Sequence, residues 1–143
     1  MLTHTLATPA DYPRLTAIWT RSVTATHPFL SLADREAIQR DLPRYFAQVT
    51  LWRWQLDEHL IGFTGMAGSD LAMLFLDPTY FRHGYGQQII RILMKTANLQ
   101  TVTVNAQNPG ALAFYQRQGF KIISQNSLDA DGRSYPIINL SLT

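Results

Sequence analysis

Residues 74–90 read LFLDPTYFRHGYGQQII, and this stretch decides the fold. Its start completes a short apolar run, 71–76, which Asp77 and Pro78 stop. Because the run is short and ends at a proline, it predicts a strand buried on both faces rather than a core helix. Its end begins an amphipathic helix over 84–97. One apolar stripe of that helix consists of Ile89, Ile92, Leu93 and Thr96.

The turn between this strand and this helix, residues 82–87, is the first segment able to carry chemistry. At a helix N-terminus the first backbone N–H groups have no intrahelical acceptor, and together with the helix dipole they form a site for a phosphate or pyrophosphate. Gly84 and Gly86 lack the Cβ that would keep a ligand from the backbone, and Arg82 and His83 would add charge. By themselves, two glycines one residue apart are equally typical of a plain tight turn. The segment lacks the third glycine of a dinucleotide fingerprint and the Gly-Lys-Ser/Thr of a P-loop.

The regions on either side of this segment continue an alternation of helices and strands. Thr8 and Pro9 predict a helix start, and Ser31 predicts a second helix, which Pro43 must kink or end. The core-facing residues of the first helix are Leu15, Ile18, Trp19, Ser22 and Val23. A last helix is predicted over 108–119. Strands are predicted at 3–6, 51–56, 60–67, 71–76, 101–105, 120–124 and 137–142. The order β-α-α-β-β-β-α-β-α-β-β indicates an α/β fold with a sheet of mixed direction.

The segments 51–56 and 60–67 predict a hairpin, because the polar pair at 57–58 supplies a turn between them. In the first segment Trp52 and Trp54 alternate with polar residues, which is the pattern of a strand with one buried face.

The composition is that of an ordinary globular protein. The chain of 143 residues fits one domain, and only 15% of its residues are charged. It has no cysteine and no histidine or carboxylate pair at metal-ligand spacing, so we predict no metal. Its formal charge is +2 and its arginines are spread along the chain, whereas a nucleic-acid interface would show a basic stripe. No leader-like segment or membrane-length apolar run is evident, and we expect a cytoplasmic protein with no nucleic-acid or membrane partner.

Two motifs of the chain resemble those of the GNAT superfamily of N-acetyltransferases. Segment 74–90 resembles the family's acetyl-CoA-binding motif, and segment 108–120, NPGALAFYQRQGF, resembles its Asn-x-x-Ala-x-x-Phe-Tyr-x-x-x-Gly-Phe. The motifs stand in the family's order with a predicted strand between them. Segments 22–31 and 135–140 further resemble those of small bacterial acetyltransferases.

By this resemblance the whole chain, 1–143, is expected to form a single N-acetyltransferase domain. Its central sheet is expected to be mixed and mostly antiparallel, with about seven strands and about four flanking helices. The sheet is expected to splay between the strands at 71–76 and 101–105.

The resemblance also implies where acetyl-CoA binds. The backbone of Leu74 and Leu76 would pair with the pantetheine arm as an added strand, and Phe75 would lie at the bend beside the thioester. Asn105 and Asn108 would bind the pantetheine amides. The pyrophosphate would be received by the glycine turn, which consists of Arg82, His83, Gly84, Tyr85, Gly86 and Gln87. Two simpler interpretations stay open: Phe75 fills the core, and Asn108 only caps a helix.

Two positions depart from the family's pattern. Phe81 stands where the family usually has a glutamine or arginine, which weakens a side-chain contact to the phosphate but leaves the backbone site intact. Ala72 stands near the position of the family's frequent glutamate, so no carboxylate base is visible there.

Transfer to an amine requires a base for the amine and an acid for the departing thiolate. Tyr115 matches the family's general acid, and a phenol with a reference pKa of about 10 is protonated at neutral pH. The simpler interpretation of Tyr115 is a buried aromatic residue. For the base we predict His27, with water held by backbone carbonyls as an equal competitor. The predicted acceptor pocket consists of His27, Phe29, Trp54 and Tyr135.

The sequence therefore predicts an acetyl-CoA-dependent N-acetyltransferase acting on a primary amine of a small molecule or a peptide. A non-catalytic acyl-CoA sensor of the same fold is the alternative, and a nucleotide-phosphate module is a third. The acceptor and the oligomeric state do not follow from the sequence.

Overall fold

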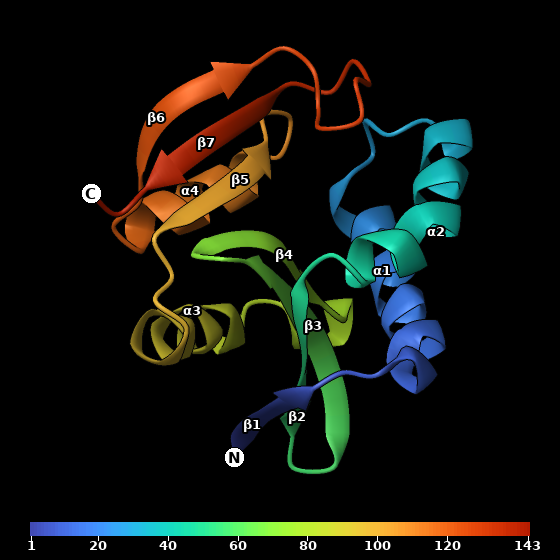
Figure 1. Ribbon diagram of the computed structural model, residues 1–143, viewed down its shortest axis with the longest axis vertical. Coiled ribbons are helices and arrows are strands. Elements are labelled where there is room, and N and C mark those ends of the chain that lie inside the picture. Colours follow the sequence, from blue (N-terminus) through green and yellow to red (C-terminus); the bar gives the residue numbers. More distant parts are fainter. The chain divides into compact units, whose positions relative to one another are not determined.

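The structure is a computed structural model that describes residues 1–143 (Figure 1). Its element order confirms the predicted alternation and adds two short 3-10 turns. The strands are β1 Leu2–Leu6, β2 Thr50–Leu56, β3 His59–Ala67, β4 Asp70–Leu76, β5 Thr101–Asn105, β6 Lys121–Asn126 and β7 Ile137–Ser141. The helices are α1 Tyr12–Thr26, α2 Leu32–Phe46, α3 Tyr85–Thr96 and α4 Pro109–Arg117, and the 3-10 turns are η1 Pro9–Asp11 and η2 Pro78–Tyr80. No helix combines the length and the apolar character needed to cross a membrane.

The seven strands form one sheet in the order β1-β2-β3-β4-β5-β7-β6. The pairing of β4 with β5 is parallel and joins Asp70–Leu71 to Thr101–Val102, whereas β1 with β2, β2 with β3, β5 with β7 and β6 with β7 are antiparallel. The predicted mixed, mostly antiparallel sheet is therefore confirmed. The chain divides into two compact units: unit 1 is Met1–Gly68 with Ala72–Gly86, and unit 2 is Ser69–Leu71 with Gln87–Thr143. The single domain over 1–143 stays a prediction.

In unit 1, the 3-10 turn η1, which leads directly into α1, follows from its sequence. The backbone N–H of Thr8 donates to the Asp11 carboxylate at 2.8 Å in a capping box, and Pro9 occupies a first-turn position that needs no N–H donor. The residues that α1 buries are the five predicted ones: Leu15, Ile18, Trp19, Ser22 and Val23. The four apolar ones among them pack with Leu42, Phe46, Leu51 and Phe63 into one apolar cluster.

Helix α2 was predicted to kink or end at Pro43, and it does not end there. Ser31 caps the helix by accepting a hydrogen bond from the backbone N–H of Asp34 at 3.1 Å, as predicted. However, the helix continues through Pro43 to Phe46. Since Pro43 lies in the last turn, only one helical hydrogen bond is lost there, and the burial of Leu42 and Phe46 favours the continued helix.

Strand β2 is covered on both faces, so the prediction of one buried face is wrong. Trp54 is fully buried on one face, and Leu51, which points to the other, is 5% exposed because it joins the apolar cluster of α1 and α2. A register shift between Trp54 and Gln55 interrupts the predicted alternation.

Strand β4 was predicted to be buried on both faces, and this prediction is wrong, because neighbouring residues of a strand point to opposite faces and only Leu71 is fully buried. Leu71 is buried and Ala72 is exposed, while residues 73–76 are half-buried. Beside the end of β4, Gly62 of β3 lies so close that an added Cβ would stand 2.4 Å from the Phe75 carbonyl oxygen. The backbone at Phe75 and Leu76 is therefore closely fitted against β3.

Unit 2 contains α3 from Gln87 onward, α4 and the strands β5, β6 and β7. Helix α3 buries Ile89, Ile90 and Leu93, whereas Thr96, predicted on the apolar stripe, is exposed and donates its hydroxyl back to the carbonyl of Ile92 at 2.8 Å. Helix α4 ends as predicted, because Gly119 adopts a left-handed φ of 101° directly after it.

Candidate active site

The turn from β4 to α3 brings most of the predicted pyrophosphate residues together in unit 1. The turn begins at Asp77. The backbone N–H of Asp77 donates to the carbonyl of Ile61 at 2.8 Å, and Oδ1 of Asp77 accepts from the N–H of Thr79 at 3.2 Å. Arg82 has a left-handed φ of 63° and Gly84 one of 82°, and no atom lies within 4 Å of a Cβ built on Gly84. Because α3 begins at Tyr85, the first N–H groups of this helix have no intrahelical acceptor.

This donor set fits a pyrophosphate. The exposed side chains of Arg82 and His83 stand immediately before the positive end of α3, and the space at Gly84 leaves the backbone open to a ligand. The φ of Gly84 is one that a residue with a Cβ adopts only with strain, so the glycine is required for the turn as well as for the approach.

An ion pair that the sequence did not indicate ties α1 to the start of this turn. Arg21 donates from Nε at 3.1 Å and from Nη2 at 2.6 Å to the same oxygen of Asp77. Burial acts to raise the pKa of Asp77, but the hydrogen bonds from Arg21 and Thr79 and the charge of Arg21 outweigh it and lower that pKa. Two residues far apart in sequence are joined here, and neither carries a local pattern that predicts the other.

Loss of this ion pair is expected to weaken the turn. In a double-mutant cycle of Arg21→Ala and Asp77→Asn, we expect a coupling of about 0.5–1 kcal/mol in the free energy of unfolding, because the Arg21 side chain is 53% exposed and water screens the pair. Since the folded-state pKa of Asp77 is lowered, its stabilisation is present above the unfolded value and disappears as the pH falls through the folded value. Denaturant unfolding at pH 7 and in acid measures both effects. Additive effects of the two substitutions would show that the pair contributes nothing, and Arg44→Ala, whose contact to Asp41 measures 3.4 Å, is a suitable control.

His27 directly follows α1, and a chain of hydrogen bonds defines the tautomer of its ring. Its Nδ1 lies 2.6 Å from the hydroxyl of Thr26, and that hydroxyl donates to the carbonyl of Ser22 at 2.8 Å. A hydroxyl has one proton, so Thr26 must accept from Nδ1–H of His27. The neutral imidazole then has its lone pair on Nε2. Burial lowers the pKa of His27 below 6.5, which keeps the ring neutral at pH 7.

The ring of His27 lies among aromatic residues of unit 1. Its centroid is 5.1 Å from that of Phe29 and 6.5 Å from that of Phe75. The structure thus brings together His27, the predicted base, Phe29, a predicted acceptor residue, and Phe75, the predicted bend of β4. Phe75 also contacts Phe63 with centroids 5.5 Å apart, so it fills the core on one side, as the simpler interpretation held.

Trp54 is not part of this cluster. Its side chain is 0% exposed, its indole N–H donates to the hydroxyl of Thr64 at 2.9 Å, and its ring stacks on His4 with centroids 4.3 Å apart. These contacts make Trp54 a packing residue that no acceptor reaches. The sequence prediction placed it in the pocket because a tryptophan on a strand is compatible with either role.

In unit 2, the two predicted asparagines shape the start of α4. Asn105 accepts from the N–H of Gln107 at 2.9 Å through its side chain, and its carbonyl accepts from the N–H of Asn108 at 3.0 Å. Asn108 caps α4 through its side-chain oxygen, which accepts from the N–H of Ala111 at 3.2 Å. Asn108 therefore caps α4, and its additional contact with pantetheine stays a prediction.

Tyr115 lies on α4 and is 8% exposed. Its ring centroid is 5.1 Å from that of Phe114 and 5.8 Å from that of Phe120. Burial raises the pKa of Tyr115, and the negative charge of Asp70 raises it further. The phenol is therefore protonated throughout the physiological range. Asp70 itself accepts a hydrogen bond from the hydroxyl of Thr101 at 2.7 Å.

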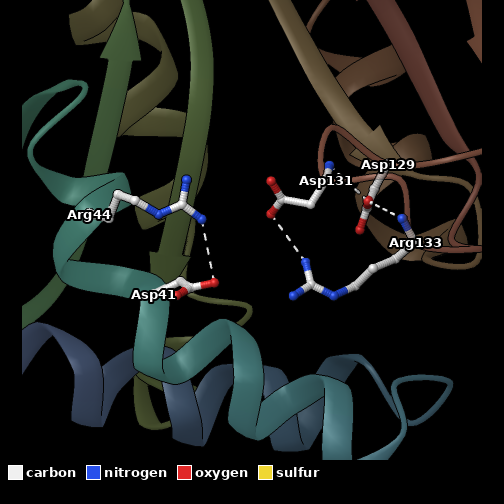
Figure 2. A network of polar contacts seen from close by, with 5 residues as sticks. All are labelled: Asp41, Arg44, Asp129, Asp131 and Arg133. Carbon is white, nitrogen blue, oxygen red and sulfur yellow. Dashed lines mark hydrogen bonds and ion pairs between the residues drawn. The ribbon is translucent and has the colours of Figure 1, made fainter.

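Tyr135 follows a tight polar loop in unit 2. The side chain of Asp129 accepts from the backbone N–H groups of Asp131 at 3.0 Å and Arg133 at 2.8 Å, and Arg133 donates to the Asp131 carboxylate at 3.1 Å (Figure 2). The backbone N–H of Tyr135 donates to the carbonyl of Arg133 at 2.8 Å. These bonds hold the loop in one shape, and the role of Tyr135 in acceptor binding stays a prediction. No group of three or more His, Cys, Asp or Glu side chains is arranged to hold a metal ion.

Comparison with known proteins shows to which family the chain belongs. A family model described as an acetyltransferase (GNAT) domain matches residues 20–135. The chain therefore belongs to the GNAT family, and it is an acetyl-CoA-dependent N-acetyltransferase, as the two motifs predicted.

Small bacterial enzymes and several solved structures are similar to this chain. The peptidyl-lysine N-acetyltransferase YjaB of Salmonella typhimurium (strain LT2) is 35% identical over 128 residues, which cover 89% of this chain and 88% of that protein. The solution structure of apo-form YjaB from Escherichia coli is 32% identical with a TM-score of 0.88, covering 100% of this chain and 98% of that one. A PaiA N-acetyltransferase from Thermoplasma acidophilum, crystallised in complex with coenzyme A, shares the fold with a TM-score of 0.72 at 20% identity, covering 99% of each chain.

Proposed function

We propose that the protein transfers the acetyl group of acetyl-CoA to the side-chain amine of lysine in peptides. The observation that carries this proposal is the hydrogen-bond chain from Ser22 through Thr26 to His27, which leaves a neutral imidazole with its lone pair on Nε2. A lysine amine is protonated at neutral pH and must lose a proton before it attacks. Relatives of this protein are named peptidyl-lysine N-acetyltransferases, which supports a peptide acceptor over a small molecule.

The proposed mechanism assigns the proton transfers to His27 and Tyr115. Nε2 of His27 takes a proton from the lysine ammonium, and the free amine attacks the thioester carbonyl. The C–S bond then breaks, and the thiolate takes the phenolic proton of Tyr115. The phenolate is neutralised by the second proton that the new amide nitrogen loses. Because burial makes Tyr115 a weaker acid, it acts as a hydrogen-bond donor that releases its proton only as charge develops on sulfur.

The turn and the strand end of unit 1 supply binding in this proposal. The first N–H groups of α3 with Arg82 and His83 hold the pyrophosphate, and the backbone at Leu74 and Leu76 pairs with the pantetheine arm. Support comes from the open space at Gly84 and from the positive end of α3.

Acetyl-CoA is expected to raise the melting temperature, whereas ATP and NAD are not. A ligand at 100 times its Kd stabilises the folded state by about 2.7 kcal/mol, which corresponds to roughly 5–10 °C for a chain of this size. Differential scanning fluorimetry measures the shift. The absence of a shift with acetyl-CoA would contradict the cofactor site. A shift without thiol release in any amine or peptide reaction would instead indicate the acyl-CoA sensor.

His27→Ala is expected to remove the acid limb of the pH-rate profile. In the wild-type protein, kcat/KM with a lysine peptide should fall as the pH drops through the pKa of His27, which lies below 6.5, because the protonated ring accepts no further proton. The variant should be slower by about a hundredfold at neutral pH and should lack this limb. His59→Ala, at the exposed start of β3, is the control and should keep it. An unchanged limb in His27→Ala would assign the base to water.

A further inference from the structure

Arg35 has a positive charge on α2 that no anion of the structure balances. Its Nη1 donates to the hydroxyl of Thr24 at 2.9 Å, while its Nε is buried without a hydrogen-bond partner. The guanidinium is charged at any pH that a protein experiences, so burying part of it without a counter-ion costs stability. The hydroxyl of Thr24 does not offset the charge, since it already donates its one proton to the carbonyl of Thr20 at 2.7 Å and is neutral.

Some arginines of the chain are paired with carboxylates, and the arginines without such a pair other than Arg35 are exposed to water. Arg21 contacts Asp77, Arg53 contacts Asp11 at 3.3 Å, and Arg133 contacts Asp131. Figure 2 shows the last of these pairs. Arg35 differs from them because its half-buried side chain meets only a neutral hydroxyl. A guanidinium without a carboxylate partner is suited to bind an anion that comes from outside the chain.

The position of Arg35 places that anion near the proposed base. Thr20 and Thr24 are spaced i and i+4 on α1, so they share one face of the helix, and His27 follows Thr24 by three residues as the residue that caps the end of α1. The hydroxyl that Arg35 contacts therefore belongs to the last turn of α1, about 4.5 Å along the helix axis from His27.

We propose that Arg35 binds a carboxylate of the acceptor, and that the preferred substrates are lysine peptides with Asp or Glu close to the lysine. This inference rests on the proposed function, in which the lysine amine reaches Nε2 of His27. An extended peptide advances about 3.3 Å per residue, so an acidic side chain one or two residues from the lysine spans the distance between the two groups. The carboxylate meets the Nη edge of the guanidinium, because Nε is fully buried.

Matched peptides test this inference. Two sets of lysine peptides are compared that differ only in having Glu or Gln at each position within two residues of the lysine. With the wild-type protein, we expect kcat/KM to be about tenfold higher for the best-placed Glu peptide, mainly through KM, and this preference should shrink as salt is added. Arg35→Gln should abolish the preference, while leaving the rate with the Gln peptide and the affinity for acetyl-CoA unchanged. Arg35→Lys should retain part of it, because the charge remains and the fork of donors does not.

The controls separate the possible outcomes. Arg40→Gln, which removes an exposed arginine of the same helix, should keep the preference. Two simple amines, one with a carboxylate and one with an amide in its place, show whether a free carboxylate serves as well as a peptide side chain. Equal rates for the Glu and Gln peptides, or a preference that survives in Arg35→Gln, would overturn the proposed binding of a carboxylate by Arg35. Neither outcome would contradict lysine acetylation itself. No acetylation of any peptide would overturn the proposed function, and the inference with it.

Discussion

Tyr115→Phe is expected to lower kcat by about a hundredfold or more and to leave the Kd of acetyl-CoA unchanged. The substitution removes the phenolic proton that the proposal gives to the departing thiolate, while the ring stays in its contacts with Phe114 and Phe120. The KM of the peptide should change little, because the hydroxyl acts on the leaving group and not on the acceptor. Steady-state kinetics with saturating peptide, together with calorimetric titration of acetyl-CoA, measure the two quantities separately.

A matched control distinguishes chemistry from packing. Tyr12→Phe removes the same hydroxyl from a tyrosine of α1 whose ring packs on Phe46, and to which the proposal assigns no chemical role. This variant should retain the wild-type kcat. Unchanged turnover in Tyr115→Phe with a saturating peptide would remove Tyr115 from the mechanism and leave it as a buried aromatic residue of α4.

Gly62→Ala is expected to destabilise the protein by about 3 kcal/mol, at the upper end of what overpacking costs. The added methyl group would stand 2.4 Å from the carbonyl oxygen of Phe75 and 2.7 Å from the Leu76 side chain. A rotamer change would move the Leu76 side chain, but only a shift of β4 would move the carbonyl. That shift would displace the backbone proposed to pair with pantetheine, so acetyl-CoA affinity should fall as well. Denaturant unfolding and titration with acetyl-CoA measure the two losses.

Gly68→Ala is the comparison for this variant. Gly68 follows β3 with a left-handed φ of 62°, and a Cβ added there meets nothing within 4 Å. Its substitution should cost about 1–2 kcal/mol from backbone strain and leave acetyl-CoA affinity unchanged. If Gly62→Ala lowered the free energy of unfolding by less than about 1 kcal/mol, the backbone of β4 at Phe75 would move at little cost, and the expected overpacking would be contradicted.

Local patterns accounted for most of the fold. The hydroxyl and proline at the start of η1, the spacing of the five buried residues of α1 and the glycine after α4 each report a backbone or packing requirement within one element. The errors arose where two elements meet. Leu51 of β2 is buried because α1 and α2 cover its face of the strand, and Pro43 is tolerated because Phe46 is held in the core. Neither cause is visible in the strand or helix alone.

The site shows the same difference between features set within one element, which the sequence predicts, and features set by contacts between elements, which it does not. Gly84 and Asn108 could be predicted because a left-handed turn and a helix cap demand particular residue types at particular places. His27 had a signal in its neighbour, since Thr26 is placed to bond back to Ser22 and accept from the ring. The pairing of Arg21 with Asp77 and the unbalanced charge of Arg35 depend on contacts between separate elements, which no spacing in the sequence reveals.

The three tryptophans of the chain, Trp19, Trp52 and Trp54, all belong to unit 1. Trp19 is 4% exposed and Trp54 is 0% exposed, so indole emission is expected to be shifted to the blue in the folded protein and to redden when this unit opens. Unit 2 has tyrosines and no tryptophan, and its unfolding changes circular dichroism but contributes no indole signal of its own. Intrinsic fluorescence is therefore a reporter of unit 1, and its coincidence with circular dichroism along a denaturation curve tests whether the two units unfold as one cooperative body.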